Sequence, residues 1–259
     1  MKILFKNEWM TKAIIVLFAF SMVSCTTNEL IVEDVINKDT TTNSKASTRT
    51  INWSNRTWVV KNGSGGPGPN NWSDDPSAVW VDSQGRLHLK VIKRNGVWYS
   101  SEVYLQNSLG HGEYRFYTET NFDTLDPKLV TGLFTYENDS REIDIEFTGS
   151  FATPSSKRGW HTVQLGNSQS FYTSMIGTHS THKILWKSDL IYWISYHGHY
   201  ASLPNRDAMM HERNYSGPLI PPVGNEKLHI NFWLFKGEAP NDGQEAELII
   251  KDFTFIPEQ

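Results

Sequence analysis

Three acidic side chains share one face of a predicted strand at residues 141–147, whose sequence is REIDIEF. Because side chains alternate between the two faces of a strand, Glu142, Asp144 and Glu146 point the same way. The two isoleucines and the phenylalanine of this segment point the other way. Acidic residues are depleted in strands, and like charges two residues apart on one face repel each other. This row of acids therefore has an energetic cost that a functional role would explain.

Paired carboxyl groups of this kind can cleave a glycosidic bond. Retaining glycosidases use two carboxyl groups about 5–5.5 Å apart, one as the nucleophile and one as the general acid and base. On a concave sheet, Glu142 and Glu146 can lean toward each other, and Asp144 between them can hydrogen-bond one partner. Neighbouring negative charges raise at least one pKa, which keeps a proton available near neutral pH.

A metal site built from oxygen ligands and a simple solvated acidic face are the two alternatives for these acids. Three carboxylates suit an ion such as Ca²⁺, but residues spaced two apart along a strand diverge too far to surround one small ion. A solvated sheet face would more often carry Thr, Lys or charges of both signs. We therefore favour acid–base chemistry and expect no metal here.

A second strand with a chemically mixed face is predicted at residues 228–235, with the sequence LHINFWLF. Its leucines, isoleucine and first phenylalanine alternate onto the core face. The other face carries His229, Asn231, Trp233 and Phe235. Rings pack on sugars and amides bind hydroxyl groups, so this face suits a saccharide-binding surface. A partly buried Trp that packs on its neighbours is the alternative.

Short strands are the elements that would position these residues. Strand-like runs recur between turn signals such as Asn95-Gly96, and no amphipathic helix is convincing. This pattern predicts an all-β domain over residues 51–259, a sandwich of two antiparallel sheets. Two irregular segments, residues 65–73 and 203–222, are candidate cleft loops.

The composition is that of a globular domain without affinity for nucleic acid. Of the 259 residues, 38% are hydrophobic and 13% aromatic, which is too apolar for a disordered chain. A formal net charge of −4 gives no long-range attraction to nucleic acid or acidic lipid. The single cysteine excludes an internal disulfide and a cysteine-built zinc cluster. We expect a monomer.

The first residues have the pattern of an export signal. Lysines precede an apolar run at residues 13–23, which is shorter than the ~20 residues that a membrane-spanning helix needs. The run ends at Met22-Val23-Ser24-Cys25, which resembles a bacterial lipobox. We predict a lipoprotein signal peptide at residues 1–24, a lipid anchor on Cys25 and a flexible tether at residues 25–50. The protein would then be exported to the cell envelope as an outer-membrane lipoprotein. A cleaved signal with an incidental cysteine is the alternative.

The acidic strand also resembles a known family. Residues 142–147 (EIDIEF) match the catalytic strand of glycoside hydrolase family 16, the laminarinase and lichenase group. The resemblance extends over most of residues 57–256. Its further motifs are Glu102 before Gly110-His111-Gly112-Glu113-Tyr114, the aromatic strand Gly132-Leu133-Phe134-Thr135-Tyr136, the residues His182, Trp186 and Trp193, and Asn231-Phe232-Trp233.

The resemblance implies a concanavalin A-like β-jelly roll with a concave cleft that hydrolyses β-glucan or a related β-linked polysaccharide with retention. Glu142 would be the nucleophile, Glu146 the general acid and base, and Asp144 the assisting carboxylate. No cofactor is implied beyond a structural calcium that some members carry on the convex side. Ser140 and Arg141 stand where many members have Trp and an acid, which leaves the glucan specificity open.

For substrate binding we expect Trp233, Asn231, Tyr136 and Trp160 to contact the polysaccharide. For Trp160, packing in a loop or in the core is an equal alternative. Three functions remain open: a retaining endo-glycosidase, a non-catalytic glycan-binding surface lipoprotein of the same fold, and a structural or adhesive envelope protein that would need no groove. The intact row of acids favours the enzyme.

The histidines do not define a metal centre by their spacing. The pair His197-Gly198-His199 is the strongest candidate, but no third ligand stands at a diagnostic distance in the sequence. No G-x-S-x-G motif and no complete dinucleotide-binding motif occurs. We therefore expect neither a metal nor a nucleotide cofactor.

Overall fold

The structure, a computed structural model, describes residues 48–151, 158–164 and 166–259. These residues belong to one compact unit that is almost entirely β. The predicted signal peptide, Cys25 and nearly all of the predicted tether lie outside the described residues. Within the described ranges, no helix is long and apolar enough to cross a membrane.

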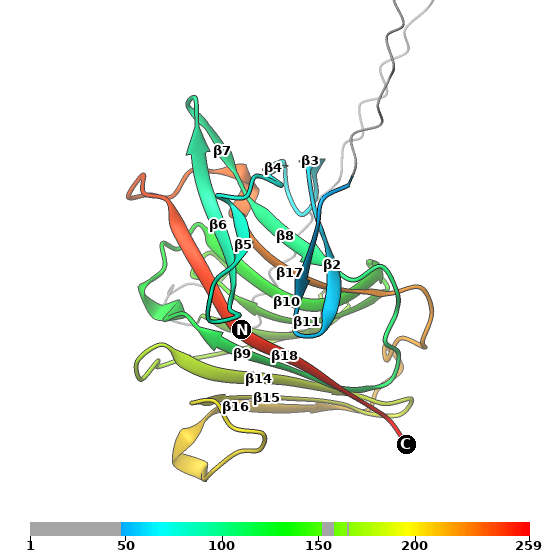
Figure 1. Ribbon diagram of the computed structural model, residues 1–259. Coiled ribbons are helices and arrows are strands. Elements are labelled where there is room, and N and C mark those ends of the chain that lie inside the picture. Colours follow the sequence, from blue (N-terminus) through cyan, green and yellow to red (C-terminus); the bar gives the residue numbers. More distant parts are fainter. Residues whose placement is uncertain (1–47, 152–157, 165) are drawn as a thin grey trace, which may run out of the picture. The chain divides into compact units, whose positions relative to one another are not determined.

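Two eight-stranded antiparallel sheets make up the domain (Figure 1). The first sheet contains, in spatial order, β1 (Thr50–Trp53), β2 (Arg56–Val60), β8 (Ser101–Tyr104), β17 (Lys227–Leu234), β10 (Leu129–Asn138), β11 (Arg141–Phe147), β12 (Gly159–Val163) and β13 (Ser168–Phe171). The second contains β16 (Met209–Tyr215), β15 (Ile191–His197), β14 (His179–Trp186), β9 (Gly112–Glu119), β18 (Ala246–Pro257), β6 (Leu87–Arg94) and β5 (Val79–Val81), with β7 (Val97–Tyr99) paired to β6. The smaller elements are the ribbon of β3 (Gly63–Gly65) and β4 (Asn70–Trp72) and the 3₁₀ turns η1 (Phe122–Thr124), η2 (Arg206–Ala208) and η3 (Phe235–Gly237). The predicted sandwich of two antiparallel sheets is confirmed.

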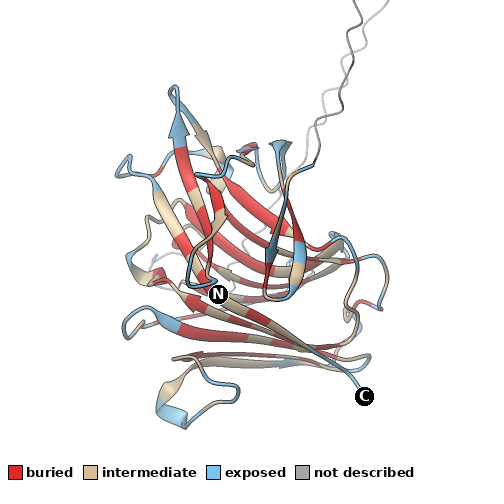
Figure 2. Ribbon diagram, viewed as in Figure 1, coloured by how far each residue is buried: buried red, intermediate tan, exposed pale blue. Residues whose placement is uncertain are grey.

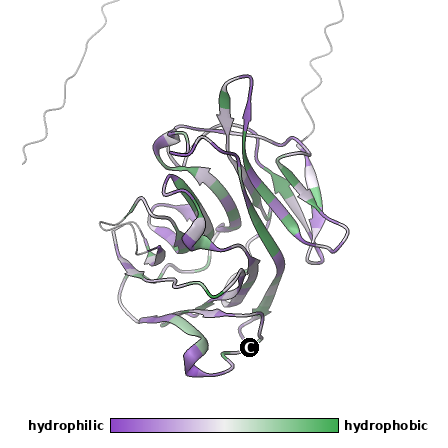
Figure 3. Cartoon of the chain, turned by 90° about the vertical axis from the view of Figure 1, so that its left-hand side faces the viewer, coloured by the Kyte–Doolittle hydropathy of each residue, from purple (hydrophilic) through white to green (hydrophobic). Residues whose placement is uncertain are grey.

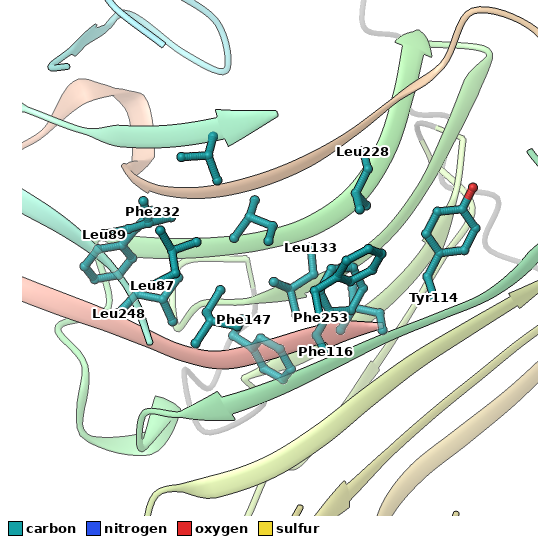
Figure 4. Close-up of a cluster of buried hydrophobic side chains, with 14 of the residues drawn as sticks. Leu87, Leu89, Tyr114, Phe116, Leu133, Phe147, Leu228, Phe232, Leu248 and Phe253 are labelled. Carbon is teal, nitrogen blue, oxygen red and sulfur yellow. The ribbon is translucent and has the colours of Figure 1, made fainter. Parts of the chain in front are cut away.

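The hydrophobic core lies between the two large sheets. Figure 4 shows side chains from both sheets meeting in one cluster. It includes Leu133, Phe147 and Phe232 from the first sheet and Phe116 and Phe253 from the second, each with at most 2% of its surface exposed. Burial of apolar area is worth about 25 cal/mol per Å², so this cluster holds the sheets face to face.

Hydrophobic and hydrophilic residues are interspersed along the strands (Figure 3). Because side chains alternate between the two faces of a strand, the apolar residues of one face enter this core. Buried residues gather on the central strands and exposed ones at the turns (Figure 2). In β17, the four residues predicted to face the core, Leu228, Ile230, Phe232 and Leu234, are all buried, which confirms the prediction. The strand ends at Leu234, however, so Phe235 begins the turn η3 and does not continue the strand face.

The two segments predicted to be irregular have different structures. Residues 203–222 contain β16, which pairs with β15 at the edge of the second sheet, so the prediction of an irregular cleft loop was wrong there. Residues 65–73 hold most of the β3–β4 ribbon and reach the cavity described below through Gly66 and Pro67.

Candidate active site

The acidic row lies on β11, on the sheet face opposite the core. Ile143, Ile145 and Phe147 are buried between the sheets with at most 1% of their surface exposed. Glu142 and Glu146 are half-buried, and Asp144 is buried with 4% exposed. The predicted alternation along this strand is confirmed, and the acids share the face that points away from the core.

Strand β10 lies beside the acidic row and supplies one partner for each acid. The cross-strand pairs are Gly132–Glu146, Phe134–Asp144 and Tyr136–Glu142. On its other side, β10 pairs Gly132 with Asn231 of β17. A Cβ atom on Gly132 would lie 2.5 Å from Oδ1 of Asn231, so glycine is needed at this position between the amide and the acids.

The acids open into a cavity of about 430 Å³ on this face. Strands β8, β17, β10 and β11 form its floor, and the β3–β4 ribbon and the turn after β10 contribute to its walls. Its lining includes Lys61, Glu102, Phe134, Tyr136, Asp139, Glu142, Asp144, Glu146, His229, Asn231 and Trp233. An aromatic lining with a few converging polar groups is typical of sites for small molecules and sugars.

Burial and mutual repulsion raise the pKa values of all three acids. Burial, followed by the charge of Asp139, raises the pKa of Glu142 to about 7. Burial, followed by the charge of Glu142, raises the pKa of Glu146 to about 8. The pKa of Asp144 lies well above its usual range because of burial and the charges of both glutamates. The row therefore retains protons at neutral pH while Glu142 is close to ionisation.

A fourth acid, Glu102 of β8, has the opposite electrostatics. Burial alone would raise its pKa, but the hydrogen bond and charge of His229, together with Lys61, outweigh burial and lower the pKa. The Nζ atom of Lys61 lies 2.9 Å from Oε2 of Glu102, and Nδ1 of His229 lies 2.9 Å from Oε1. Glu102 is therefore a buried anion with both oxygens paired.

A stack of rings crosses the floor of the cavity beside this network. The ring of His229 lies between Tyr104, at 5.3 Å and 20° between planes, and Phe134, at 5.0 Å and 19°. These residues stand in register on β8, β17 and β10. The stack fixes the orientation of His229 toward Glu102.

The structure brings three of the four predicted binding residues to the cavity. Trp233, Asn231 and Tyr136 line it, and the hydroxyl of Tyr136 donates to Oδ1 of Asp139 at 3.0 Å. Trp160 stands in register with Glu146 on β12 and packs against Phe151, but it does not line the cavity.

Two cavity residues lay outside the sequence-based prediction of the site. Asp139 lies in the turn that joins β10 to β11. Its position three residues before Glu142 was the one feature of the sequence that could have indicated its place in the cavity. Lys61 follows β2 and carries no motif, and only the antiparallel pairing of β2 with β8 brings it to Glu102. Arg141 pairs with Glu137 at 3.0 Å and does not neutralise Glu142.

One cluster of potential metal ligands occurs in the described part of the chain, and it lies outside this cavity. It consists of Glu119, His179 and His199. The ligand atoms of the three acids of β11 do not converge in this way.

Solved structures of β-glucanases share this fold at low sequence identity. A β-glucanase from Bacillus licheniformis has a TM-score of 0.58 at 16% identity, covering 78% of this chain and 92% of its own. A glycoside hydrolase family 16 endo-glucanase from Bacteroides ovatus, in complex with G4G3G-2F-DNP, has a TM-score of 0.53 at 12% identity, covering 77% and 94%. An immunostimulatory antigen and pseudo β-1,3-glucanase of Mycobacterium tuberculosis has a TM-score of 0.58 at 12% identity, covering 78% and 91%.

No protein-family model matches the sequence, and no curated protein sequence matches it. At these identities the structural likenesses show the fold. The domain is a β-jelly roll of the type found in family 16 β-glucanases, as the resemblance of the acidic strand predicts.

Proposed function

We propose that the protein is a retaining endo-glycosidase that hydrolyses a β-linked polysaccharide, a β-glucan or a related chain. One observation carries the proposal: a single strand presents three carboxyl groups with raised pKa values to an open cavity lined by rings and hydrogen-bonding groups. A carboxyl group that stays protonated near neutral pH can act as a general acid, and a neighbouring carboxylate can act as a nucleophile.

In the proposed reaction, Glu142 attacks the anomeric carbon and forms a bond from its carboxylate oxygen to C1. The C1–O bond to the leaving saccharide breaks, and Glu146 donates its proton to that oxygen. Water then attacks C1, Glu146 takes a proton from it, and Glu142 is released. Asp144 lies between the two glutamates on the same strand face. Because its pKa is raised, its carboxyl group stays protonated and would donate a hydrogen bond to one of the two glutamates.

The polysaccharide would bind across the floor formed by β17, β10 and β11. Tyr136 offers a ring face for pyranose rings. Trp233 and Asn231 are almost fully buried, with 7% and 1% of their surface exposed, so they would contact the sugar only through the atoms that line the cavity. Trp160 would extend this surface beyond the cavity, since β12 continues the sheet next to the acidic row. The β-glucanase activity of the structural neighbours is the basis for naming a β-glucan first.

We also propose that the enzyme is exported and anchored by a lipid on Cys25, with residues 25–50 as the tether to the outer membrane. This proposal rests on the sequence pattern of residues 1–25. Labelling with a radioactive fatty acid tests it, because Cys25→Ser should abolish the label. Retention of the label in that variant would exclude this anchor.

The activity is tested with protein lacking residues 1–24, incubated with a panel of β-glucans, galactans and host glycans. We expect Glu142→Gln and Glu146→Gln to lose at least about 10³-fold in kcat on a polysaccharide substrate. An aryl glycoside with a good leaving group should restore the first step for Glu146→Gln only, because that step no longer needs a general acid. Proton NMR of the first product should show the retained anomer.

A matched control is Glu113→Gln on the outer face of the second sheet, where Glu113 pairs with Lys183 at 2.8 Å. This variant should keep full activity. Equal product release by the wild type and Glu142→Gln would refute the assignment of Glu142, and an inverted product would refute the retaining mechanism.

A non-catalytic glycan-binding protein is the second candidate. One structural neighbour with this fold is described as a pseudo β-1,3-glucanase, so the fold alone does not imply glucanase activity. Under this alternative the wild type releases no product from any glycan on the panel, yet it and Glu142→Gln bind the same glycan with equal affinity.

A further inference from the structure

A second group of chemically active side chains lies on the outer face of the second sheet. Glu119 is the last residue of β9 and His179 is the first residue of β14, and the two stand opposite each other in register. The residues that alternate with Glu119 along β9, including Phe116 and Thr118, are buried, so Glu119 points away from the core. His199 follows β15 and completes the group.

The three side chains converge on one point. One ligand atom from each of Glu119, His179 and His199 lies within 4.8 Å of the others. Nε2 of His179 lies 3.5 Å from Oε1 of Glu119, and the two imidazole rings are 4.6 Å apart at 83°. Ligand atoms around a tetrahedral Zn²⁺ lie about 3.3 Å apart, given bonds of about 2.0–2.1 Å, so small side-chain rotations would close the group around one ion.

Hydrogen bonds to the rest of the domain already orient two of the three ligands. Nε2 of His199 lies 2.8 Å from the carbonyl oxygen of Thr118, so it must donate its proton there, and Nδ1 keeps its lone pair. Histidine ligands of metals characteristically donate their second N–H to a carbonyl or carboxylate in this way. Arg86 donates to Oε2 of Glu119 at 3.0 Å, which leaves Oε1 directed toward His179.

We propose that Glu119, His179 and His199 form a binding site for a divalent transition metal of the Zn²⁺ class. Two imidazoles and one carboxylate are a ligand set that Zn²⁺ accepts, whereas Ca²⁺ and Mg²⁺ prefer oxygen ligands alone. The site joins the end of β9, the start of β14 and the turn after β15. Three protein ligands leave a fourth position for water or for a group from another molecule.

The ammonium group of Lys251 would compete with a metal ion for the carboxylate of Glu119. Nζ of Lys251 lies 4.0 Å from Oε1 of Glu119, and its side chain is 51% exposed. This lysine can turn toward solvent when an ion binds, at a small cost because exposed ion pairs are weak. Its removal should therefore tighten metal binding several-fold.

The sequence motif His197-Gly198-His199 contributes one ligand and not two. His197 pairs with Ser180 across β14 and β15, and its parity along β15 is that of the buried Ser195. Its Nδ1 faces the backbone N–H of Ile176 at 3.5 Å. The side chains of His197 and His199 therefore lie on opposite faces of the sheet. His197 is a matched control for substitutions of His199, because it is a nearby histidine outside the proposed site.

The test is a calorimetric titration of the full chain, purified without a polyhistidine tag, with ZnCl₂, CaCl₂ and MgCl₂. We expect one Zn²⁺ per chain with a dissociation constant of about 10 μM or tighter, and no binding of Ca²⁺ or Mg²⁺ at this site. His179→Ala and His199→Ala should each weaken Zn²⁺ binding at least about tenfold, while His197→Ala should not. Lys251→Met should strengthen it.

A spectroscopic measurement provides an independent answer. Co²⁺ in the same site should give visible absorption bands typical of four-coordinate nitrogen and oxygen ligation, and the bands should disappear in His199→Ala. Zn²⁺ should also raise the melting temperature of the wild type but not of His199→Ala, since a ligand that binds only the folded state stabilises it. Zn²⁺ binding weaker than about 10 μM, or equal loss of binding in His197→Ala and His199→Ala, would overturn the proposal.

Discussion

Glu102 and His229 lie on adjacent strands of the cleft, with 2.9 Å between Oε1 of the glutamate and Nδ1 of the histidine. Through the pairs Glu102–Asn231, Asn231–Gly132 and Gly132–Glu146, Glu102 stands in one cross-strand row with Glu146. The two ends of this row have opposite protonation behaviour. His229 and Lys61 lower the pKa of Glu102, whereas burial and a neighbouring acid raise that of Glu146.

Replacement of Glu102 by Gln should destabilise the fold in a pH-dependent way. The folded-state pKa is depressed, so the stabilisation is present above the unfolded value of 4.5 and is lost as the pH falls below it. We expect Glu102→Gln to lower the free energy of unfolding by about 1–3 kcal/mol at pH 7, measured by urea denaturation. The loss should shrink at low pH.

Glu238→Gln is the control for this measurement, because Glu238 pairs with Lys128 at the surface and its removal should leave the free energy of unfolding nearly unchanged. A loss in Glu102→Gln that is the same at acid and neutral pH would contradict the assigned charge state of Glu102.

The proposed hydrolase activity should have a bell-shaped pH dependence set by the two glutamates as a pair. Activity should rise as Glu142 ionises, at a pKa of about 7, and fall as Glu146 loses its proton, at about 8. The charge of Asp139 is the second cause of the raised pKa of Glu142. Asp139→Asn should therefore move the acid limb of kcat/KM to lower pH.

For this profile, Asp207→Asn in the exposed turn η2 serves as the comparison and should leave both limbs in place. If Asp139→Asn shifted the alkaline limb alone, the assignment of Glu142 to the acid limb would be wrong.

The acidic row should reduce stability at high pH. Burial raises the folded-state pKa of Glu146 from 4.5 to about 8, so wild-type stability falls as the pH rises between these values. We expect Glu146→Gln to be more stable than the wild type by about 1–3 kcal/mol at pH 8, and the difference to become small at pH 4.5 or below. Thermal and urea unfolding at both pH values would measure it, and a variant that is less stable at pH 8 would disprove this account.

Trp160 offers a direct test of how far the binding surface extends past the cavity. Its position opposite Glu146 predicts that Trp160→Ala raises KM for a polysaccharide about tenfold or more, with a smaller effect on short substrates. Trp98 of β7 is a half-buried tryptophan on the other sheet, and Trp98→Ala should leave KM unchanged. Equal KM values in wild type and Trp160→Ala would show that Trp160 has a packing role.

The sequence predicted the elements whose residues alternate strongly. In β11 and β17 every second residue is large and apolar, so their core faces were predictable without knowledge of their partners. Strand β16 was missed because its sequence, MMHERNY, lies at a sheet edge where six of its seven residues are half-buried and none is buried. No alternation exists there for sequence reasoning to detect.

The residues of the candidate site that share one face of a single strand could be predicted from the sequence. The three acids of β11 and the face with Asn231 and Trp233 follow from period-two alternation. Lys61 could not be predicted, since it meets Glu102 only through the pairing of β2 with β8, more than forty residues apart in the chain. The grouping of His199 with Glu119 and His179 likewise depends on how β9, β14 and β15 align.

The connection between β10 and β11 consists of Asp139 and Ser140 alone. One hairpin therefore carries the acidic row, Tyr136 and Asp139, whose charge raises the pKa of Glu142. The apolar side chains on the other face of this hairpin are buried between the two sheets. Protein engineers could graft alternative connections onto this hairpin to change its reactivity, because a surface insertion at its tip leaves the underlying packing intact.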